Sequence, residues 1–261
     1  MKKLLLIILS VLVTSSCDFS PPYQREILLA QEYIQNHDYE KAISLYEKIL
    51  KRNPTNDLSL KIYFQLGDLY SIYLAKYPKA IDYYKKVKEI TDDPLWTIKV
   101  EEKIADINFT YLRNFEKSYA SYALLSKFIP KLQNHDFYKY RSALSLQNSG
   151  KYIESLEVLN AIKEDSGSTY NIKANYSIGI TYFHLKNWKE AIASWREYLK
   201  NETNKEAIIQ TKFIMANAYE MLENLKTAYN IYYSILGEYP NTEVIQNRIN
   251  SIYARRVARK R

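Results

Sequence analysis

The sequence contains few of the residues that end helices or cross-link a chain. Its 261 residues include five glycines, seven prolines and one cysteine. A single cysteine excludes an internal disulfide, and the scarcity of glycine and proline favours helices over sheets. Leu, Ile, Ala, Lys and Glu are plentiful instead, and hydrophobic residues make up 47% of the chain, which excludes global disorder. We therefore expect a helical protein with an ordinary buried core.

The sequence also lacks the motifs of common active sites. HExxH, paired cysteines, a glycine-rich phosphate loop and GxSxG are all absent. The three histidines, His37, His135 and His184, are far apart along the chain. Acid pairs such as Glu101 and Glu102 are expected to lie on a solvated face. We predict that the protein is not an enzyme and that it uses no metal, cofactor or small-molecule substrate.

The net positive charge of the chain comes mostly from its two ends. The formal net charge is +8, but Lys2 and Lys3 stand at the extreme N-terminus. The tail "RRVARKR" contains no acidic residue, and its basic members are Arg255, Arg256, Arg259, Lys260 and Arg261. Because the body between these ends is close to neutral, we expect no binding to nucleic acid. Three interpretations of the tail are open: contact with anionic lipid, contact with an acidic partner, or a solvated end.

The N-terminus has the layout of a secretory signal. Two lysines precede an apolar run over residues 4–13, and the small residues 14–16 follow. A basic segment, an apolar segment of this length and a small-residue cleavage site are the three parts of such a signal. The run is too short to span a bilayer, which takes about 20 residues. We therefore expect an exported protein.

The single cysteine, Cys17, stands directly after these small residues. The stretch "LVTSSC" resembles a bacterial lipobox, with Thr14 in place of the more usual Leu. The resemblance implies removal of residues 1–16, attachment of diacylglycerol to the thiol of Cys17, and a short tether over residues 17–22. Several acyl chains would anchor the protein stably, at roughly 0.8 kcal/mol per buried CH₂. The alternative is an ordinary signal peptide with an incidental cysteine.

A short pattern recurs at intervals of 36–38 residues along the chain. "DYEKAISLYEKIL" at residues 38–50 and "NWKEAIASWREYL" at residues 187–199 are two copies of it. Its small residue stands at Ala42, Ala80, Ser118, Ser155, Ala191 and Ala228. Four residues later stand Tyr46, Tyr84, Tyr122, Leu159, Trp195 and Tyr232. Because residues four apart share one helix face, the small residue admits a neighbouring helix and the larger one fills the space beside it.

Each of these predicted helices follows another helix with a mark of its own. A small residue followed three positions later by an apolar one occurs at Ala30, Gly67, Ala143, Gly179 and Ala216. The third repeat departs from the pattern, because Ala105 is followed by Asn108, with Phe109 next to it. Helix pairs that repeat at this length predict a solenoid.

This alternation of small and aromatic residues resembles the tetratricopeptide repeat, and the likeness extends over residues 23–241. The fifth repeat, "IGITYFHLKNWKEAIASWREYL", matches best. The resemblance implies an all-α fold, a right-handed superhelical α-solenoid of about six helical hairpins. The usual period is about 34 residues, so the extra residues imply longer loops or longer helices. Residues 242–261 are expected to form a capping helix, as terminal repeats require, and the basic tail.

The resemblance also implies where a partner would bind. The first helices of the repeats line the concave face of such a solenoid, which suits an extended peptide or a partner's helix. On the family's register, the predicted partner-binding residues are Phe137, Tyr140, Arg141, Lys173, Tyr176, Ile180, Phe183, Phe213 and Asn217. The alternative is that several of them pack between adjacent repeats. A clamp for a terminal carboxylate is expected to be absent, because Asp68, Leu144 and Ile180 stand where that clamp has Asn.

Taken together, these features predict a non-catalytic scaffold of the bacterial cell envelope. It is expected to be lipid-anchored on the periplasmic side of the inner or the outer membrane, and to bind a protein or peptide partner. Signal, lipobox, repeats and the phrase "EYPNTE" at residues 238–243 resemble the outer-membrane assembly lipoproteins of the β-barrel insertion machinery. Asp18 after Cys17 resembles an inner-membrane retention signal and favours an organiser of cell-wall synthesis or division. An enzyme on an α-solenoid frame is the third hypothesis.

Overall fold

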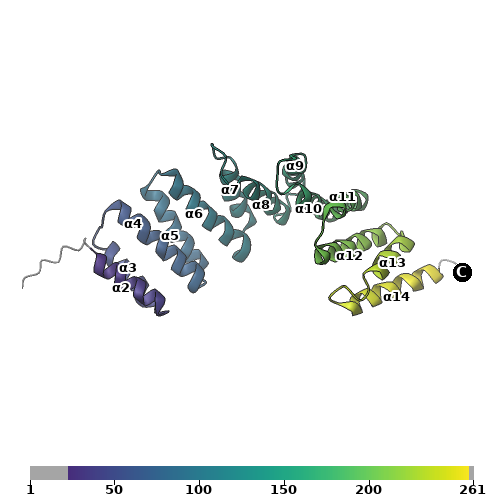
Figure 1. Cartoon of the computed structure of the whole chain (residues 1–261), viewed down its shortest axis with the longest axis horizontal. Coiled ribbons are helices and arrows are strands. Elements are labelled where there is room, and N and C mark those ends of the chain that lie inside the picture. The colour runs from purple at the N-terminus through teal and green to yellow at the C-terminus, as the bar shows by residue number, and fades with distance from the viewer. Residues whose placement is uncertain (1–22, 259–261) are drawn as a thin grey trace, which may run out of the picture. The chain divides into compact units, whose positions relative to one another are not determined.

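The structure is a computed structural model that describes residues 23–258 (Figure 1). These residues form helices and turns without any β-strand. The predicted signal, Cys17, the tether before residue 23, and the tail residues Arg259, Lys260 and Arg261 lie outside the described residues. The chain divides into two compact units, an N-terminal unit that ends at Val100 and a C-terminal unit that begins at Glu101. Each unit is described by itself below.

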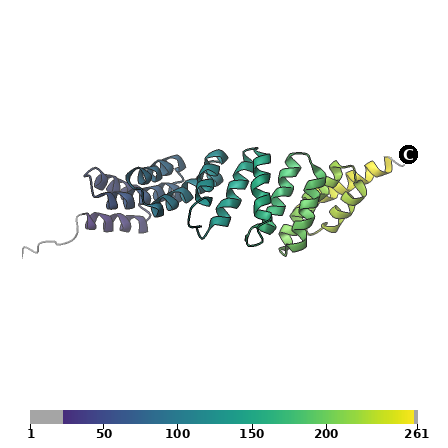
Figure 2. The same ribbon diagram turned by 90° about the horizontal axis from the view of Figure 1, so that it is seen from above.

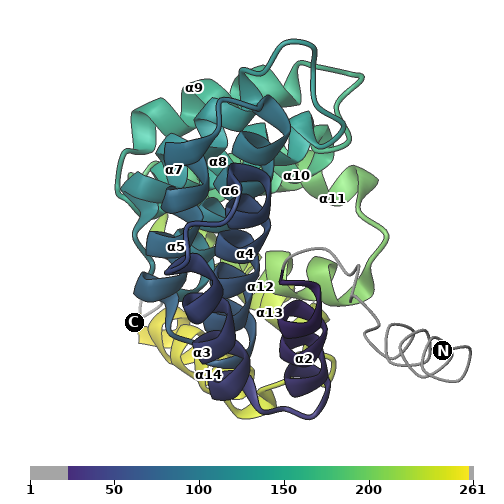
Figure 3. The same cartoon turned by 90° about the vertical axis from the view of Figure 1, so that its left-hand side faces the viewer.

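The N-terminal unit consists of antiparallel helices joined by short turns. Its helices are α2 (Gln24–Gln35), α3 (Tyr39–Leu50), α4 (Asn56–Asp68) with a π-helical turn η1 (Leu69–Tyr73), α5 (Tyr77–Ile90) and the first half of α6 (Pro94–Asp106). Helix α2 packs on α3, and α4 packs on α5 (Figure 3). The pairs α2/α3 and α4/α5 are therefore the first two helical hairpins that the sequence predicts.

The C-terminal unit continues the same pattern. Its helices are the rest of α6 with a π-helical turn η2 (Ile107–Tyr111), α7 (Phe115–Ser126), α8 (His135–Asn148), α9 (Tyr152–Lys163), α10 (Asn171–His184), α11 (Trp188–Asn201), α12 (Lys205–Met221), α13 (Leu225–Ser234) and α14 (Thr242–Ala258). Each helix packs on the next along the chain from α7 to α14 (Figure 2). The predicted all-α solenoid of helical hairpins is confirmed.

The core of every hairpin is built from the small and large residues of the repeat. All six small residues of the second helices are buried, and so are the six large residues four positions later. In the first helices, a side chain at Gly67 would overlap the ring of Tyr84, and one at Gly179 would overlap the indole of Trp195. Glycine at these two positions is therefore a packing requirement, because the aromatic ring occupies the space that a Cβ atom would need.

The turn inside each hairpin contains one residue in the left-handed region. These residues are His37, Ala75, Arg113, Gly150, Lys186 and Glu223, with φ between 50° and 82°. The following amide closes the turn on a carbonyl of the first helix, as the N–H of Asp38 does on Tyr33, at 2.8 Å. Only one of the six positions is glycine, so five turns adopt this conformation at a cost of about 1 kcal/mol each.

The two π-helical turns explain why the second and third repeats are longer. The two small residues of a hairpin are 12 positions apart in four repeats, but 13 apart from Gly67 to Ala80 and from Ala105 to Ser118. In these two hairpins the closing hydrogen bonds span six residues instead of five, from Lys76 N to the Tyr70 carbonyl and from Asn114 N to the Asn108 carbonyl, at 2.8 Å each. The extra residue is therefore absorbed at the end of the first helix.

The departure of the third repeat from the pattern has a local explanation. Asn108 is buried, and its side-chain amide donates to the carbonyl of Ile104 at 2.8 Å. The position three residues after the small residue thus remains part of the core in this repeat although it is polar, because the amide finds its partner within its own helix.

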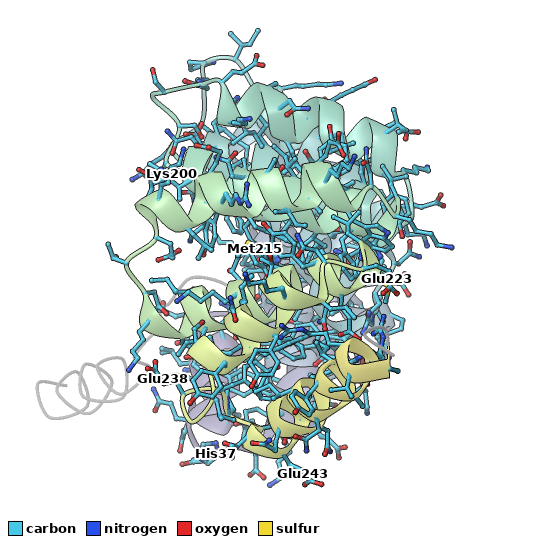
Figure 4. The ribbon with its side chains drawn as sticks, turned by 90° about the vertical axis from the view of Figure 1, so that its right-hand side faces the viewer. His37, Lys200, Met215, Glu223, Glu238 and Glu243 are labelled. Carbon is cyan, nitrogen blue, oxygen red and sulfur yellow. The ribbon has the colours of Figure 1, made fainter. Side chains whose placement is uncertain are left out.

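Helix α14 covers the end of the C-terminal unit, as a capping helix is expected to do. It buries Ile245, Ile249 and Ile252 against the cluster formed by α12 and α13. Figure 4 shows Met215 inside this cluster, with Glu223 at one edge of the unit and Glu238 at the opposite edge. The helix runs to Ala258, so Arg255 and Arg256 are helical and do not belong to an extended tail.

Replacing Gly179 with Ala should destabilise the protein, because the added methyl group overlaps the indole of Trp195. We expect the free energy of unfolding to fall by about 1–3 kcal/mol in a chemical denaturation experiment. Gly167→Ala is the matched control, since only a side-chain oxygen of Asp165 lies near its added Cβ atom. Equal stability of the two variants would contradict this account of the hairpin core.

Deleting Ile72, which is 61% exposed in η1, should convert the second hairpin to the spacing of the shorter repeats. The expected loss is at most about 1 kcal/mol, because the helix can close the turn without its π-helical part. Deleting His184, at the corresponding position of α10, leaves the fifth hairpin one residue short and should cost several times more. Denaturation midpoints of the two variants would test the comparison, and similar losses would refute it.

Candidate protein-interaction site

The first helices of the hairpins carry the predicted partner-binding residues. Counted from the small residue of each first helix, the position three residues before it is aromatic in four repeats: Phe64, Tyr140, Tyr176 and Phe213. The first repeat has Ile27 there and the third has Glu102. Apart from Ile27 and Glu102, the position therefore provides aromatic side chains of the kind that anchor protein interfaces.

The residue directly after the small residue serves a different purpose. Asp68 accepts a hydrogen bond from the hydroxyl of Tyr84 at 2.7 Å, and Asp106 accepts one from Tyr122. Asn217 accepts one from Tyr232 in the same way. These polar side chains thus satisfy the hydroxyl groups of the rings packed on the first helix.

In two repeats the residue after the small residue is apolar, and the large residue of the second helix is then not a tyrosine. Leu144 is matched by Leu159 in the fourth repeat, and Ile180 by Trp195 in the fifth. The indole N–H of Trp195 donates instead to the backbone carbonyl of Tyr176 at 3.2 Å. In these two hairpins the second helix therefore has no hydroxyl group that needs an acceptor at this position.

These tyrosines are not candidates for acid–base chemistry. Burial raises the pKa of the Tyr122 hydroxyl well above its ordinary value, and the hydrogen bond to Asp106 raises it further. Burial and the carboxylate of Asp68 have the same effect on the pKa of Tyr84. The hydroxyl groups therefore remain protonated and act as hydrogen-bond donors.

Arg141 is engaged within the C-terminal unit. Its guanidinium lies 3.8 Å from the ring centroid of Phe109. The Nη2 atom is 3.6 Å from a carboxylate oxygen of Asp106, and Nε donates to the hydroxyl of Tyr122 at 3.3 Å. A cation over an aromatic face with a carboxylate beside it is already stabilised by its own chain. Arg141 therefore links α8 to α7 and the end of α6.

Most of the other predicted partner-binding residues are half-buried between helices. The Tyr140 ring stacks on Tyr170 with centroids 4.8 Å apart, and the Tyr140 and Ser177 hydroxyl oxygens are 2.8 Å apart. Other aromatic contacts of these residues include Phe137 with Tyr122, Phe183 with Trp188 and Trp195, and Phe213 with Tyr232 and Tyr239. Ile180 packs against the same core cluster as Phe213. These side chains contribute to packing as well as to the face of the first helices.

Two predicted residues lie where a partner could reach them. Lys173 is exposed, and Tyr176 lines a cavity of about 410 Å³ at the junction of α10, α11 and α12. The other lining residues are Tyr198, Asn204, Glu206, Ala207 and Gln210. A second hollow of about 480 Å³ shares Glu206 and Gln210 and extends to the loop before α14. The two hollows meet at Glu206 and Gln210, near the N-terminal end of α12.

The N-terminal unit has a cavity that the sequence did not indicate. It measures about 300 Å³ and lies among the first helices α2, α4 and α6, with one residue from α3. Its lining consists of Ile27, Gln31, Tyr46, Leu58, Lys61, Ile62, Phe64, Gln65 and Trp96. Apart from Tyr46 and Ile62, these residues are not buried, so the cavity is open to a ligand on the face of the first helices.

The described part of the basic tail is bound to the end of the C-terminal unit. The guanidinium of Arg255 pairs with Glu220 at 2.8 Å and with Glu223 at 2.6 Å. The guanidinium of Arg256 lies 5.6 Å from the ring centroid of Tyr229. These contacts hold α14 against α12 and α13, so Arg255 and Arg256 stabilise the position of the capping helix.

In residues 23–258, His, Cys, Asp and Glu side chains do not gather into a group of three or more that could hold a metal ion. Among the described helices, none combines the length and the hydropathy that a membrane span requires.

Comparison with known proteins places this architecture. A model of the tetratricopeptide repeat matches residues 24–93, and a model described as a domain of unknown function (DUF6340) matches residues 177–251. No curated protein matches the chain significantly.

Solved structures are similar over most of the chain. The type IV pilus biogenesis factor PilW is 16% identical, with 87% of this chain and 98% of that chain covered and a TM-score of 0.54. The apo form of RapI is 19% identical, with 85% and 65% covered and a TM-score of 0.63. A tetratricopeptide repeat protein from Parabacteroides merdae ATCC 43184 is 16% identical, with 90% and 87% covered and a TM-score of 0.61.

These likenesses define the class of the protein as an α-solenoid of helical hairpins. More narrowly, the chain has the fold of tetratricopeptide repeat proteins, and residues 24–93 also carry the sequence pattern of that repeat. The resemblance inferred from the spacing of small and aromatic residues is therefore confirmed.

Proposed function

We propose that this protein is a non-catalytic, lipid-anchored scaffold of the bacterial cell envelope that binds a partner protein or peptide along the face of its first helices. The observation that carries the proposal is the pair of open cavities on that face, one in each unit. Both combine aromatic side chains with exposed amide or charged groups, which is the composition of an interface anchor.

The shape of these cavities favours an extended peptide or a helix as the partner. One hollow lies among Tyr176, Tyr198 and Gln210, and the neighbouring hollow extends from Gln210 of α12 to Pro240 in the loop before α14. A ligand that occupies both hollows crosses the N-terminal end of α12 and is therefore elongated. A compact small molecule would be expected in a single enclosed site with converging polar groups.

The anchor is the second part of the proposal, and it rests on the sequence before residue 23. A basic segment, an apolar run over residues 4–13 and small residues directly before Cys17 are what lipid attachment needs. A scaffold held to a membrane in this way finds its partner at high local concentration, because both are confined to one surface.

Two refinements of the proposal differ in the membrane concerned. The phrase "EYPNTE" at residues 238–243 favours a role beside the outer-membrane assembly machinery, whereas Asp18 favours the inner membrane and a role in cell-wall synthesis or division. Separation of inner and outer membranes by density, followed by detection of the protein, distinguishes the two.

Cys17→Ser should release the protein from membranes, because no thiol is left to carry the acyl chains. We expect the variant in the aqueous fraction after cell breakage, and the parent in the detergent phase of a phase-separation experiment. Ser16→Ala keeps a small residue before the cysteine and is the matched control. If the Cys17 variant stays with the membrane, the proposed anchor is wrong.

A photo-crosslinking side chain in place of Gln210 should capture the partner in cells, because Gln210 lines both hollows beside α12. The same side chain in place of Ala193, an exposed residue of the second helix α11, is the matched control. We expect a discrete crosslinked product from position 210 and none from position 193. The reverse result would move the binding face to the second helices.

A further inference from the structure

The inference concerns Tyr46, which occupies the ring position of the first repeat. Its counterparts Tyr84, Tyr122 and Tyr232 each donate a hydrogen bond to the residue that follows the small residue of the first helix. In the first repeat that residue is Gln31. Among residues 23–258, no group accepts a hydrogen bond from Tyr46, and burial alone raises the pKa of its hydroxyl.

The hydroxyl of Tyr46 is nevertheless accessible. Asn175 Oδ1 is the one fully buried side-chain atom of the described residues that lacks a partner, so the Tyr46 oxygen is not sealed off. Tyr46 and Gln31 both line the 300 Å³ cavity of the N-terminal unit. The tyrosine hydroxyl group, which donates within the chain in three other repeats, therefore belongs here to a residue that lines a cavity.

A ligand that supplies the acceptor would be held strongly. A donor that has no partner within the chain gains one when a ligand brings an acceptor to it. The acceptors in the corresponding hairpins are the carboxylates of Asp68 and Asp106 and the amide of Asn217. A carboxylate or amide oxygen is thus the group that fits this position.

The charge around the cavity favours the carboxylate. The ammonium group of Lys99 lies 4.8 Å from the ring centroid of Trp96, which lines the cavity, and Lys99 forms no ion pair within the part of the chain that the structure describes. Lys61 also lines the cavity, although Asp57 neutralises it at 2.8 Å. One cation without an ion pair therefore lies next to a residue of the cavity lining.

The rest of the lining suits a peptide. Ile27, Leu58, Phe64 and Trp96 form apolar walls of the cavity, whose 300 Å³ accommodate one large side chain. Gln31 and Gln65 are exposed on the same face, and each amide can donate to and accept from a peptide backbone. The polar contacts are thus arranged around an apolar centre.

We propose that this cavity binds an extended segment of the partner protein in which an acidic side chain stands next to a bulky apolar one. The carboxylate accepts the hydrogen bond of Tyr46 beside Lys99, and the apolar side chain fills the space among Ile27, Leu58 and Trp96. This assignment rests on the proposed function, because it names the chemistry of the partner at one of the two cavities.

The probe for this proposal is a fluorescein-labelled, blocked peptide with the sequence Gly-Ser-Asp-Phe-Ser-Gly, titrated with residues 18–261 of the chain. We expect saturable binding by fluorescence anisotropy below about 1 mM. Replacing Asp by Asn in the peptide should weaken binding about fivefold, and replacing Phe by Ala about tenfold. Absence of binding, or equal binding of the three peptides, would overturn the proposal.

Variants of the protein locate the contact. Tyr46→Phe should weaken binding of the parent peptide about tenfold without lowering the melting temperature, because the hydroxyl has no partner to lose. Tyr84→Phe is the matched control one repeat further on, and it should lower the melting temperature and leave binding within about twofold. Lys99→Gln should abolish the preference for Asp over Asn. Normal binding by Tyr46→Phe would overturn the assignment.

Two other outcomes separate this assignment from neighbouring explanations. If the peptide binds and only substitution of Gln210 weakens it, binding along the first helices stands and the assignment to the N-terminal cavity fails. The chain's own Asp18 and Phe19 have the same chemistry as the probe. If replacing both with Ala tightens peptide binding about tenfold, that segment competes for the cavity, and the assignment to a partner protein is overturned.

Discussion

The structure depends on one contact that recurs in its hairpins: a large side chain of the second helix rests on a small residue of the first. At Gly67 and Gly179 the contact is so close that a single methyl group would collide with the ring. This closeness sets the distance between the two helices, because neither can move without opening a void or creating an overlap. It also brings the tyrosine hydroxyl beside the next residue of the first helix, which explains why an Asp or Asn stands there in three repeats.

The fold could be predicted from the sequence because this contact is local and leaves a periodic trace. Ala42 and Tyr46, or Ala191 and Trp195, are four residues apart, and both members of each pair are buried. The π-helical turns could not be predicted in the same way. The spacing from Gly67 to Ala80 reveals one extra residue, but whether that residue enters the helix, the turn or the loop depends on competing hydrogen bonds that the pattern does not contain.

The candidate site was predicted only in part. Tyr176 lines a cavity, whereas Arg141, which was predicted for the same groove, is engaged by Phe109 and Asp106 of its own chain. The cavity around Tyr46 was not predicted, because the predicted groove residues all lie in the last three repeats. Its position in the first repeat follows from the same counting, since Ile27 and Phe64 correspond to Tyr176. Its volume could not be predicted, because it depends on how side chains from four helices fill a shared space.

The two π-helical turns have a consequence for how such a chain can change. Each takes up an added residue at the bend of a hairpin, and the small residue of the first helix and the ring of the following helix both remain buried. An inserted residue at the bend therefore leaves the surface formed by the first helices unchanged. Repeats of unequal length can therefore share the same contact between a small and a large residue, so the length of a repeat and the residues that meet a ligand can change separately.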